Sequence, residues 1–156
     1  MKFTFSKFSI QDFPAYQSWF SDKTLDAELG PMDHDWLEAV LQQENGCQYS
    51  IFSQDELIAV IGVIFPDAGH PSYYITDFAV RPDNRNQGIG SKILTELLEQ
   101  KELQSVLSWK AFVKKDNDSA KRFFTKNGWY LISEIPDEHG MLEFEILRTK
   151  DKDDLS

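Results

Sequence analysis

The chain has little cysteine, little histidine and no long apolar run. Cys47 is the one cysteine among 156 residues, which excludes an internal disulfide. The three histidines and Cys47 form no cluster with zinc-ligand spacing, so we expect no metal site. No apolar run approaches the roughly 18 residues that a membrane-spanning helix needs. The start of the chain lacks a basic segment followed by an apolar one, so we expect a cytoplasmic protein.

Basic residues are also scarce, and their distribution is uneven. The chain has 16 Lys and Arg against 26 Asp and Glu. Residues 1–46 and 134–156 each carry a net charge of −5, whereas residues 81–126 carry +4. We expect no nucleic acid partner, because a basic surface is missing over most of the chain. The middle segment suits an anionic ligand and the flanks a cationic one, although amphipathic helices that display charge for solubility explain the pattern equally well.

The segment from Tyr74 to Ser91 is the most informative part of the chain. An apolar strand ending at Val80 leads into a turn with Gly88 and Gly90, and an amphipathic helix follows at once. The first N–H groups of a helix are unpaired, and glycines let a phosphate approach them closely. The segment therefore predicts an anion site, most simply for a pyrophosphate. A tight strand-to-helix turn that binds nothing is the alternative.

Two other phosphate loops do not fit this segment. The P-loop needs a lysine and then Ser or Thr directly after its last glycine, and here Ser91 precedes Lys92. The dinucleotide fingerprint needs a third glycine, and its position is occupied by Ile93.

Hydrophobic periodicity predicts one continuous α/β unit without linkers or repeats. We expect a first strand at Phe3–Phe8, helices over 12–20 and 33–43 with Asp33 as N-cap and Gly46 as terminator, and a final acidic, flexible tail over 149–156. The other expected elements are a hairpin of strands 47–53 and 57–65, a strand over 72–80, a helix over 88–101, a strand over 105–113, a helix over 117–127 stopped by Gly128, and strands over 129–135 and 141–148. This order predicts a mixed sheet with helices on both faces.

Two motifs in the expected order resemble the GNAT N-acetyltransferase superfamily. Arg85, Gly88 and Gly90 form the pattern Arg-x-x-Gly-x-Gly, and the segment 117–129 is similar to that family's Asn-x-x-Ala-x-x-aromatic-Tyr-x-Lys-x-Gly-aromatic segment. The resemblance is strong over residues 57–136 and faint over 1–46. It implies a mostly antiparallel α/β (α+β) sheet of six to seven strands, with a splay between two parallel central strands.

The resemblance also implies acetyl-CoA as the cofactor. Backbone groups of the strand end would bind the pantetheine arm, and amides of the glycine loop would bind the pyrophosphate. The cofactor-binding residues implied in this way are Phe78, Ala79, Val80, Arg85, Asn86, Gln87, Gly88, Ile89, Gly90, Ser91, Asn117, Ala120, Phe123, Phe124 and Lys126.

One motif position departs from the family pattern. Phe124 stands where the family usually has the tyrosine that protonates the leaving thiolate. Positioned proton transfer contributes about 10²–10⁴-fold to a rate, but a thiolate is a tolerable leaving group without help. Water can supply the proton, or another phenol can, with Tyr130 as the first candidate and Tyr73 and Tyr74 as others. The third alternative is a domain that binds acyl-CoA and catalyses poorly.

Asp77 is the candidate general base, or a counter-ion for an ammonium group. It lies three residues before the end of the strand that feeds the glycine loop. A carboxylate that is partly desolvated between strands has a raised pKa and accepts a proton near neutral pH. The alternative is an Asp that pairs with a lysine or caps the loop. The Ile-Thr-Asp-Phe-x-Val string faintly resembles polyamine acetyltransferases, but Thr76 replaces their glutamate.

The resemblance assigns acceptor binding to the connection between the first two helices and to the last hairpin. The first of these is acidic and contains aromatic rings, which suits an amine. The candidate acceptor-binding residues are Asp26, Glu28, His34, Trp36 and Tyr74. Core packing of the aromatic residues is the alternative.

The sequence therefore predicts one acyltransferase domain over residues 1–148 that transfers acetyl from acetyl-CoA to a primary amine of a small, cationic acceptor. The alternatives are a non-catalytic acyl-CoA-binding or regulatory module and a protein N-terminal or lysine acetyltransferase. The final hairpin is a candidate homodimer surface, and we expect no membrane partner.

Overall fold

A computed structural model describes residues 1–148 of the chain. Within that range it has a mixed α/β fold with a seven-stranded sheet in the order β1-β2-β3-β4-β5-β7-β6. The pairs β1/β2, β2/β3, β5/β7 and β6/β7 are antiparallel, and β4/β5 is parallel. The predicted fold class, a mostly antiparallel sheet with two parallel central strands, is confirmed. The acidic tail predicted over 149–156 lies outside the described residues.

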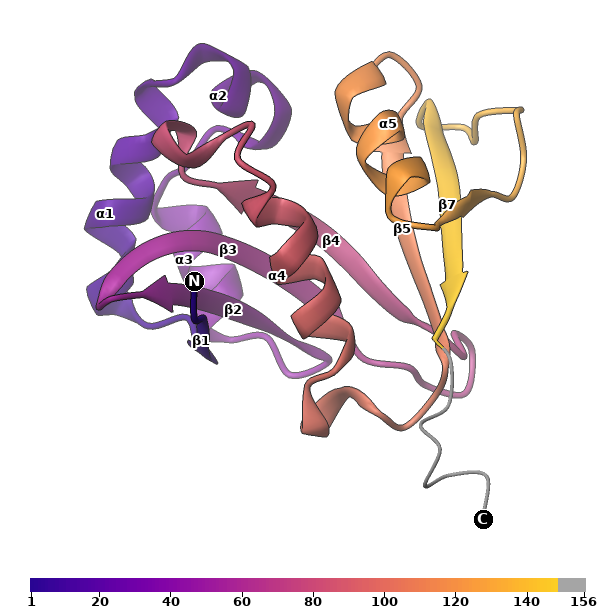
Figure 1. Cartoon of the computed structure of the whole chain (residues 1–156), viewed down its shortest axis with the longest axis horizontal. Helices are drawn as coiled ribbons and strands as arrows, with labels where there is room; N and C mark the ends of the chain where they lie inside the picture. Colours follow the sequence, from indigo (N-terminus) through magenta and orange to yellow (C-terminus); the bar gives the residue numbers. More distant parts are fainter. Residues whose placement is uncertain (149–156) are drawn as a thin grey trace. The chain divides into compact units, whose positions relative to one another are not determined.

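Figure 1 labels the α-helices and all strands except β6. The strands are β1 Thr4–Lys7, β2 Gly46–Ser53, β3 Glu56–Ile64, β4 Tyr73–Val80, β5 Ser108–Lys114, β6 Tyr130–Leu131 and β7 Met141–Leu147. The α-helices are α1 Phe13–Ser18, α2 Lys23–Leu29, α3 His34–Leu41, α4 Ile89–Leu98 and α5 Asp118–Lys126. Short 3-10 turns are η1 Ile10–Asp12, η2 Trp19–Ser21, η3 Pro82–Asn84 and η4 Lys101–Leu103.

The chain divides into two compact units. The first comprises Met1–Ile64 and Thr76–Ile93, and the second comprises Phe65–Ile75 and the chain from Leu94 onward. The parallel pairing of β4 with β5 joins Tyr73–Ile75 to Trp109–Ala111, all within the second unit. The rest of β4, the loop after it and the first turn of α4 belong to the first unit.

The core of the first unit is rich in aromatic residues. Rings of α1 and α3 pack against each other and against the sheet, with Tyr16 fully buried at the centre. The ring of Tyr16 lies 5.3 Å from Trp19, 5.1 Å from Phe20 and 5.3 Å from Trp36. The contacts with Trp19 and Phe20 are edge-on, which is favourable because ring edges are positive and ring faces negative.

The second unit packs α5 against its antiparallel strands. Phe124 is the buried residue of α5, and its ring lies 5.0 Å from Trp129 and 5.9 Å from Phe144 of β7. The helix ends as predicted, with Asn127 as C-cap and Gly128 at φ +89°, a left-handed conformation that suits glycine.

Several parts of the chain differ from the sequence prediction. Residues 23–29 form helix α2 rather than a loop, because Asp22 caps the helix by accepting from the Leu25 amide and Leu25 is buried. The first predicted helix is split into η1, α1 and η2. Gly46 begins β2 and does not terminate α3. The strand predicted over 129–135 contracts to β6, because the Ser133 hydroxyl accepts from the Ile135 amide in a local turn.

Candidate functional site

The loop between β4 and α4 lies in the first unit, and its backbone turns sharply. Asn86 has φ +63° and Gly88 has φ +74°. A Cβ at Gly88 would meet nothing within 4 Å, so the space beside this glycine is open. Helix α4 starts one residue later, at Ile89, which is buried. An exposed, glycine-lined loop directly before a helix N-terminus fits an anionic phosphate group.

Arg85, predicted to lie near the pyrophosphate, has a carboxylate partner. Its guanidinium nitrogens lie 3.1 Å from both side-chain oxygens of Asp22. Asp22 also caps α2, and these bonds, with the Leu25 amide first and Arg85 next, hold the pKa of its carboxyl below the usual range. The glycine loop is therefore tied to the start of α2, and this ion pair was missed by sequence reasoning. Its two members are 63 positions apart in the chain.

Asp77 lies on β4, where its carboxylate is held from two sides. The Gln48 side-chain amide donates to Oδ2 at 2.6 Å, and the Thr76 hydroxyl donates to Oδ1 at 2.8 Å. Burial raises the pKa of Asp77, and the two hydrogen bonds oppose that shift only in part. Asp77 can thus accept a proton at a higher pH than an ordinary aspartate, because its pKa is raised.

The Tyr16 hydroxyl from α1 also belongs to the surroundings of Asp77. Tyr16 is fully buried, and no described residue hydrogen-bonds to its hydroxyl. Burial, and secondarily the negative charge of Asp77, raise the pKa of Tyr16 far above the usual value. The phenol therefore keeps its proton at any physiological pH.

The structure places the other predicted cofactor residues on three elements. In β4, Ala79 is buried in the aromatic core, and Phe78 and Val80 are half-buried. Asn117 is the N-cap of α5 and accepts from the Ala120 amide at 3.1 Å. Further along α5, Phe123 contacts Phe124 at a ring distance of 5.4 Å, and Lys126 is exposed in the last turn. Gln87 is exposed before α4, and Gly90 and Ser91 are half-buried in its first turn.

Tyr130, the predicted alternative acid, lies on the two-residue strand β6 and is 49% exposed. Its hydroxyl donates to a carboxylate oxygen of Glu145 at 2.8 Å. That hydrogen bond raises the pKa of Tyr130. Glu145 also lies near Lys110, which pairs more closely with Glu143 at 3.1 Å.

The predicted acceptor residues lie on several elements. Asp26 and Glu28 lie exposed on α2. His34 begins α3, with its ring 5.7 Å from Phe13. Trp36 is half-buried, and its indole packs 5.3 Å from Phe8 within the aromatic core. In the second unit, Tyr74 stacks on Phe112 with ring centroids 5.6 Å apart.

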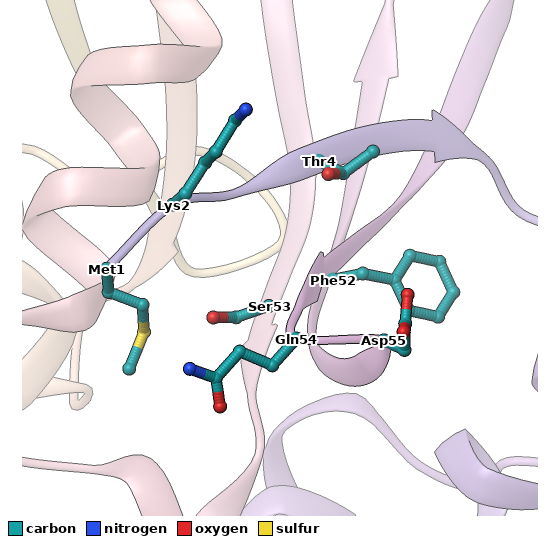
Figure 2. Close-up of a pocket in the computed structure, with 7 residues that line it drawn as sticks. All are labelled: Met1, Lys2, Thr4, Phe52, Ser53, Gln54 and Asp55. Atoms are coloured by element: carbon teal, nitrogen blue, oxygen red, sulfur yellow. The ribbon is translucent and has the colours of Figure 1, made fainter.

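Two hollows of the first unit contain none of the predicted site residues. One, of about 710 Å³, lies between the first residues of the chain and the β2–β3 turn, where Ser53 and Gln54 extend toward Met1 (Figure 2). The other, of about 640 Å³, is bounded by the end of α1, the start of β3 and η3. None of the helices described over residues 1–148 combines the length and the hydrophobicity that a membrane span requires.

Comparison with known proteins identifies the family. The model of the Acetyltransferase (GNAT) family matches residues 13–129. A search of curated protein sequences gives no match. Three similar solved structures are an acetyltransferase from Thermus thermophilus, a spermidine N-acetyltransferase from Vibrio cholerae in complex with CoA and spermine, and the ribosomal-protein-S18-alanine N-acetyltransferase from Escherichia coli.

These structures share the fold at low sequence identity. The Thermus structure has a TM-score of 0.80 at 15% identity and covers 94% of this chain and 97% of its own. The Vibrio structure has a TM-score of 0.75 at 12% identity and covers 94% of this chain and 95% of its own. The Escherichia structure has a TM-score of 0.68 at 16% identity and covers 97% of both chains. The family match spans most of the aromatic core, Asp77, the glycine loop and α5. The chain therefore belongs to the acetyltransferase (GNAT) family of enzymes.

Proposed function

We propose that residues 1–148 act as one acetyl-CoA-dependent N-acetyltransferase domain whose acceptor is a primary amine of a small, cationic molecule. The observation that carries this proposal is a carboxylate of raised pKa, Asp77, on the strand that leads directly into the glycine loop. The loop fits a phosphate because of its positive φ angles at Asn86 and Gly88 and the open space beside Gly88. The Vibrio neighbour, named for spermidine and solved with CoA and spermine, supports the substrate class.

In this proposal the loop amides and Arg85 hold the pyrophosphate of acetyl-CoA, and the end of β4 aligns the acyl arm. Asp77 accepts a proton from the ammonium form of the acceptor. The freed amine attacks the thioester carbonyl, so that an N–C bond forms and the C–S bond breaks, and the attacking nitrogen gives up a second proton to water. The sulfur leaves as a thiolate and takes up a proton from water or from Tyr130, because Phe124 has none to give. We assign the acceptor contacts to Asp26, Glu28, His34, Trp36 and Tyr74. A cytoplasmic location is also part of the proposal.

A second candidate function rests on Phe124. This residue lies within a buried aromatic cluster and lacks the hydroxyl of the usual family acid. A non-catalytic acyl-CoA-binding module would tolerate that loss.

Turnover with a panel of primary amines separates the two candidates. We expect mass spectrometry to detect an acetylated amine and free CoA in equal amounts. Tight acetyl-CoA binding without any acetylated product would favour the binding module. Acetylation of peptide N-termini or lysines in preference to polyamines and other small amines would redirect the proposal to a protein acceptor.

A further inference from the structure

A hydrogen bond crosses an entire strand to reach Asp77. Gln48 lies on β2 and Asp77 on β4, with β3 between them. Neighbouring strands lie about 4.8 Å apart, so the backbones of β2 and β4 are separated by roughly 10 Å. The Gln48 amide nevertheless donates to the Asp77 carboxylate at 2.6 Å. The two side chains must meet above the residue of β3 that lies between them.

That residue is Gly62. It pairs directly with Gln48 in the β2–β3 ladder and is buried. A Cβ at this position would overlap side-chain oxygens of Asp77, Thr76 and Gln48. Glycine weakens a strand, so an isolated glycine in the otherwise apolar strand β3 marks a place where other groups approach closely. Here the approaching groups are the carboxylate and its two donors.

We propose that Gln48 is a positioning residue for Asp77. The absence of a side chain at Gly62 leaves the space in which the Gln48 and Asp77 side chains meet. The inference rests on the proposed function of Asp77 as proton acceptor. Each carboxylate oxygen is held by a different neutral donor, Oδ2 by Gln48 and Oδ1 by Thr76. The carboxylate is thus fixed in one rotamer, and the donors favour its ionised form against the cost of burial. Gln48 thereby helps to set the pH above which the enzyme works.

The effect of Gln48 on the pKa of Asp77 can be measured, because the groups around Asp77 do not themselves titrate in the working range. Tyr16 of α1 is close enough to feel the charge of Asp77. The other neighbours are neutral: the Gln48 amide on β2, Gly62 on β3 and the Thr76 hydroxyl on β4. The raised pKa of Tyr16 keeps the phenol neutral throughout the working range. An acidic limb in the pH profile of kcat/KM then reports on Asp77 among these groups.

The test compares Gln48→Met with the parent enzyme. Methionine has a similar length and no donor, so the carboxylate loses one of its two hydrogen bonds. We expect the acidic limb of kcat/KM for the amine to move to higher pH by about one pH unit or more, which lowers kcat/KM about tenfold or more at pH values on the acidic side of the limb. The affinity for acetyl-CoA measured by calorimetry should not change. Carboxyl NMR should show a higher pKa for Asp77 in the variant, and this readout needs no turnover.

Ser50→Ala is the matched control. Ser50 is a fully buried polar residue of the same strand, two positions further along, and its hydroxyl donates to Asp12 at 2.8 Å. This variant should keep the parent profile and the parent pKa of Asp77. Thr76→Val removes the other donor and should shift both readouts in the same direction as Gln48→Met.

Gly62→Ala tests whether the contact between Gln48 and Asp77 needs the space above Gly62. We expect it to lower kcat more than it changes acetyl-CoA affinity, provided that thermal unfolding confirms a folded protein. If it does not fold, Gln48→Met alone decides. An unchanged Asp77 pKa and pH profile in Gln48→Met would overturn the positioning role while leaving the proposed function intact. An Asp77 pKa that rises as expected in a protein that acetylates no amine would support the positioning of Asp77 and overturn the proposed function.

Discussion

The N-terminus of α5 provides a quantitative prediction. Asn117 caps this helix by accepting a hydrogen bond from the Ala120 amide at 3.1 Å. The helix has nine residues, too few to be stable alone, and Phe124 is its buried residue. Replacing a capping Asn by Ala costs about 0.5–2 kcal/mol of the free energy of unfolding. For a chain of this size each kcal/mol lowers the midpoint of thermal unfolding by about 2–4 °C.

We therefore expect Asn117→Ala to unfold a few degrees below the parent and Asn117→Ser, which keeps a capping oxygen, to unfold close to it. Thermal unfolding followed by circular dichroism measures both. The family resemblance also gives Asn117 a cofactor contact, so the same variants should be titrated with acetyl-CoA. Loss of affinity in both, with loss of stability only in Asn117→Ala, would separate the two roles. Equal unfolding temperatures for the Ala and Ser variants would refute the capping argument.

Three further predictions concern the site. Because the native pKa of Asp77 is raised, the unfolded chain loses this proton first as the pH rises above the ordinary carboxyl value of about 3.9, and ionisation then opposes folding. Asp77→Asn should therefore unfold at a higher temperature than the parent at pH 7 to 8 and at the same temperature below about pH 4, and its turnover should be slow. Equal unfolding temperatures at every pH would contradict the raised pKa of Asp77. Arg85→Gln should weaken acetyl-CoA binding more than Asp22→Asn does, because Asp22→Asn keeps an N-cap for α2 and keeps the Arg85 guanidinium. If calorimetry shows equal losses of acetyl-CoA affinity in both variants, the Arg85–Asp22 pair only holds the loop in place. Phe124→Tyr should leave kcat unchanged or raise it, whereas a marked fall at unchanged cofactor affinity would show that a hydroxyl is not tolerated in the buried cluster of Phe124, Trp129 and Phe144.

The parts of the molecule that depend on local sequence were predictable. Asp33 caps α3, the β2–β3 hairpin turns at Gln54 and Asp55 with positive φ, and Gly128 follows α5 in a left-handed conformation. The cap follows from the side-chain oxygen of Asp33, the turn from polar residues between two apolar runs, and the end of α5 from the ease with which glycine adopts a positive φ. The glycine loop after β4 was located for the same reason, because Gly88 does adopt a positive φ.

The parts that depend on tertiary register were not predictable. Gln48 and Asp77 are 29 positions apart, and their contact requires that β3 present a glycine between them. The signal was present, since Gly62 interrupts an apolar strand, but its partners are set by strand order and register. Helix α2 was missed because its seven residues bury only Leu25 and so carry no clear periodicity.

The central claim is that the loop before α4 binds the diphosphate of acetyl-CoA, and calorimetric titration of acetyl-CoA tests it most directly. Gly88→Asp should be compared with Gly140→Asp, because both glycines have a similar positive φ, +74° and +77°, and open space around the missing side chain. The backbone strain is therefore matched, and only the location of the new charge differs. We predict saturable heat at one site for the parent and for Gly140→Asp, and none for Gly88→Asp. Equal affinity in all three proteins, or no heat with the folded parent, would contradict the account.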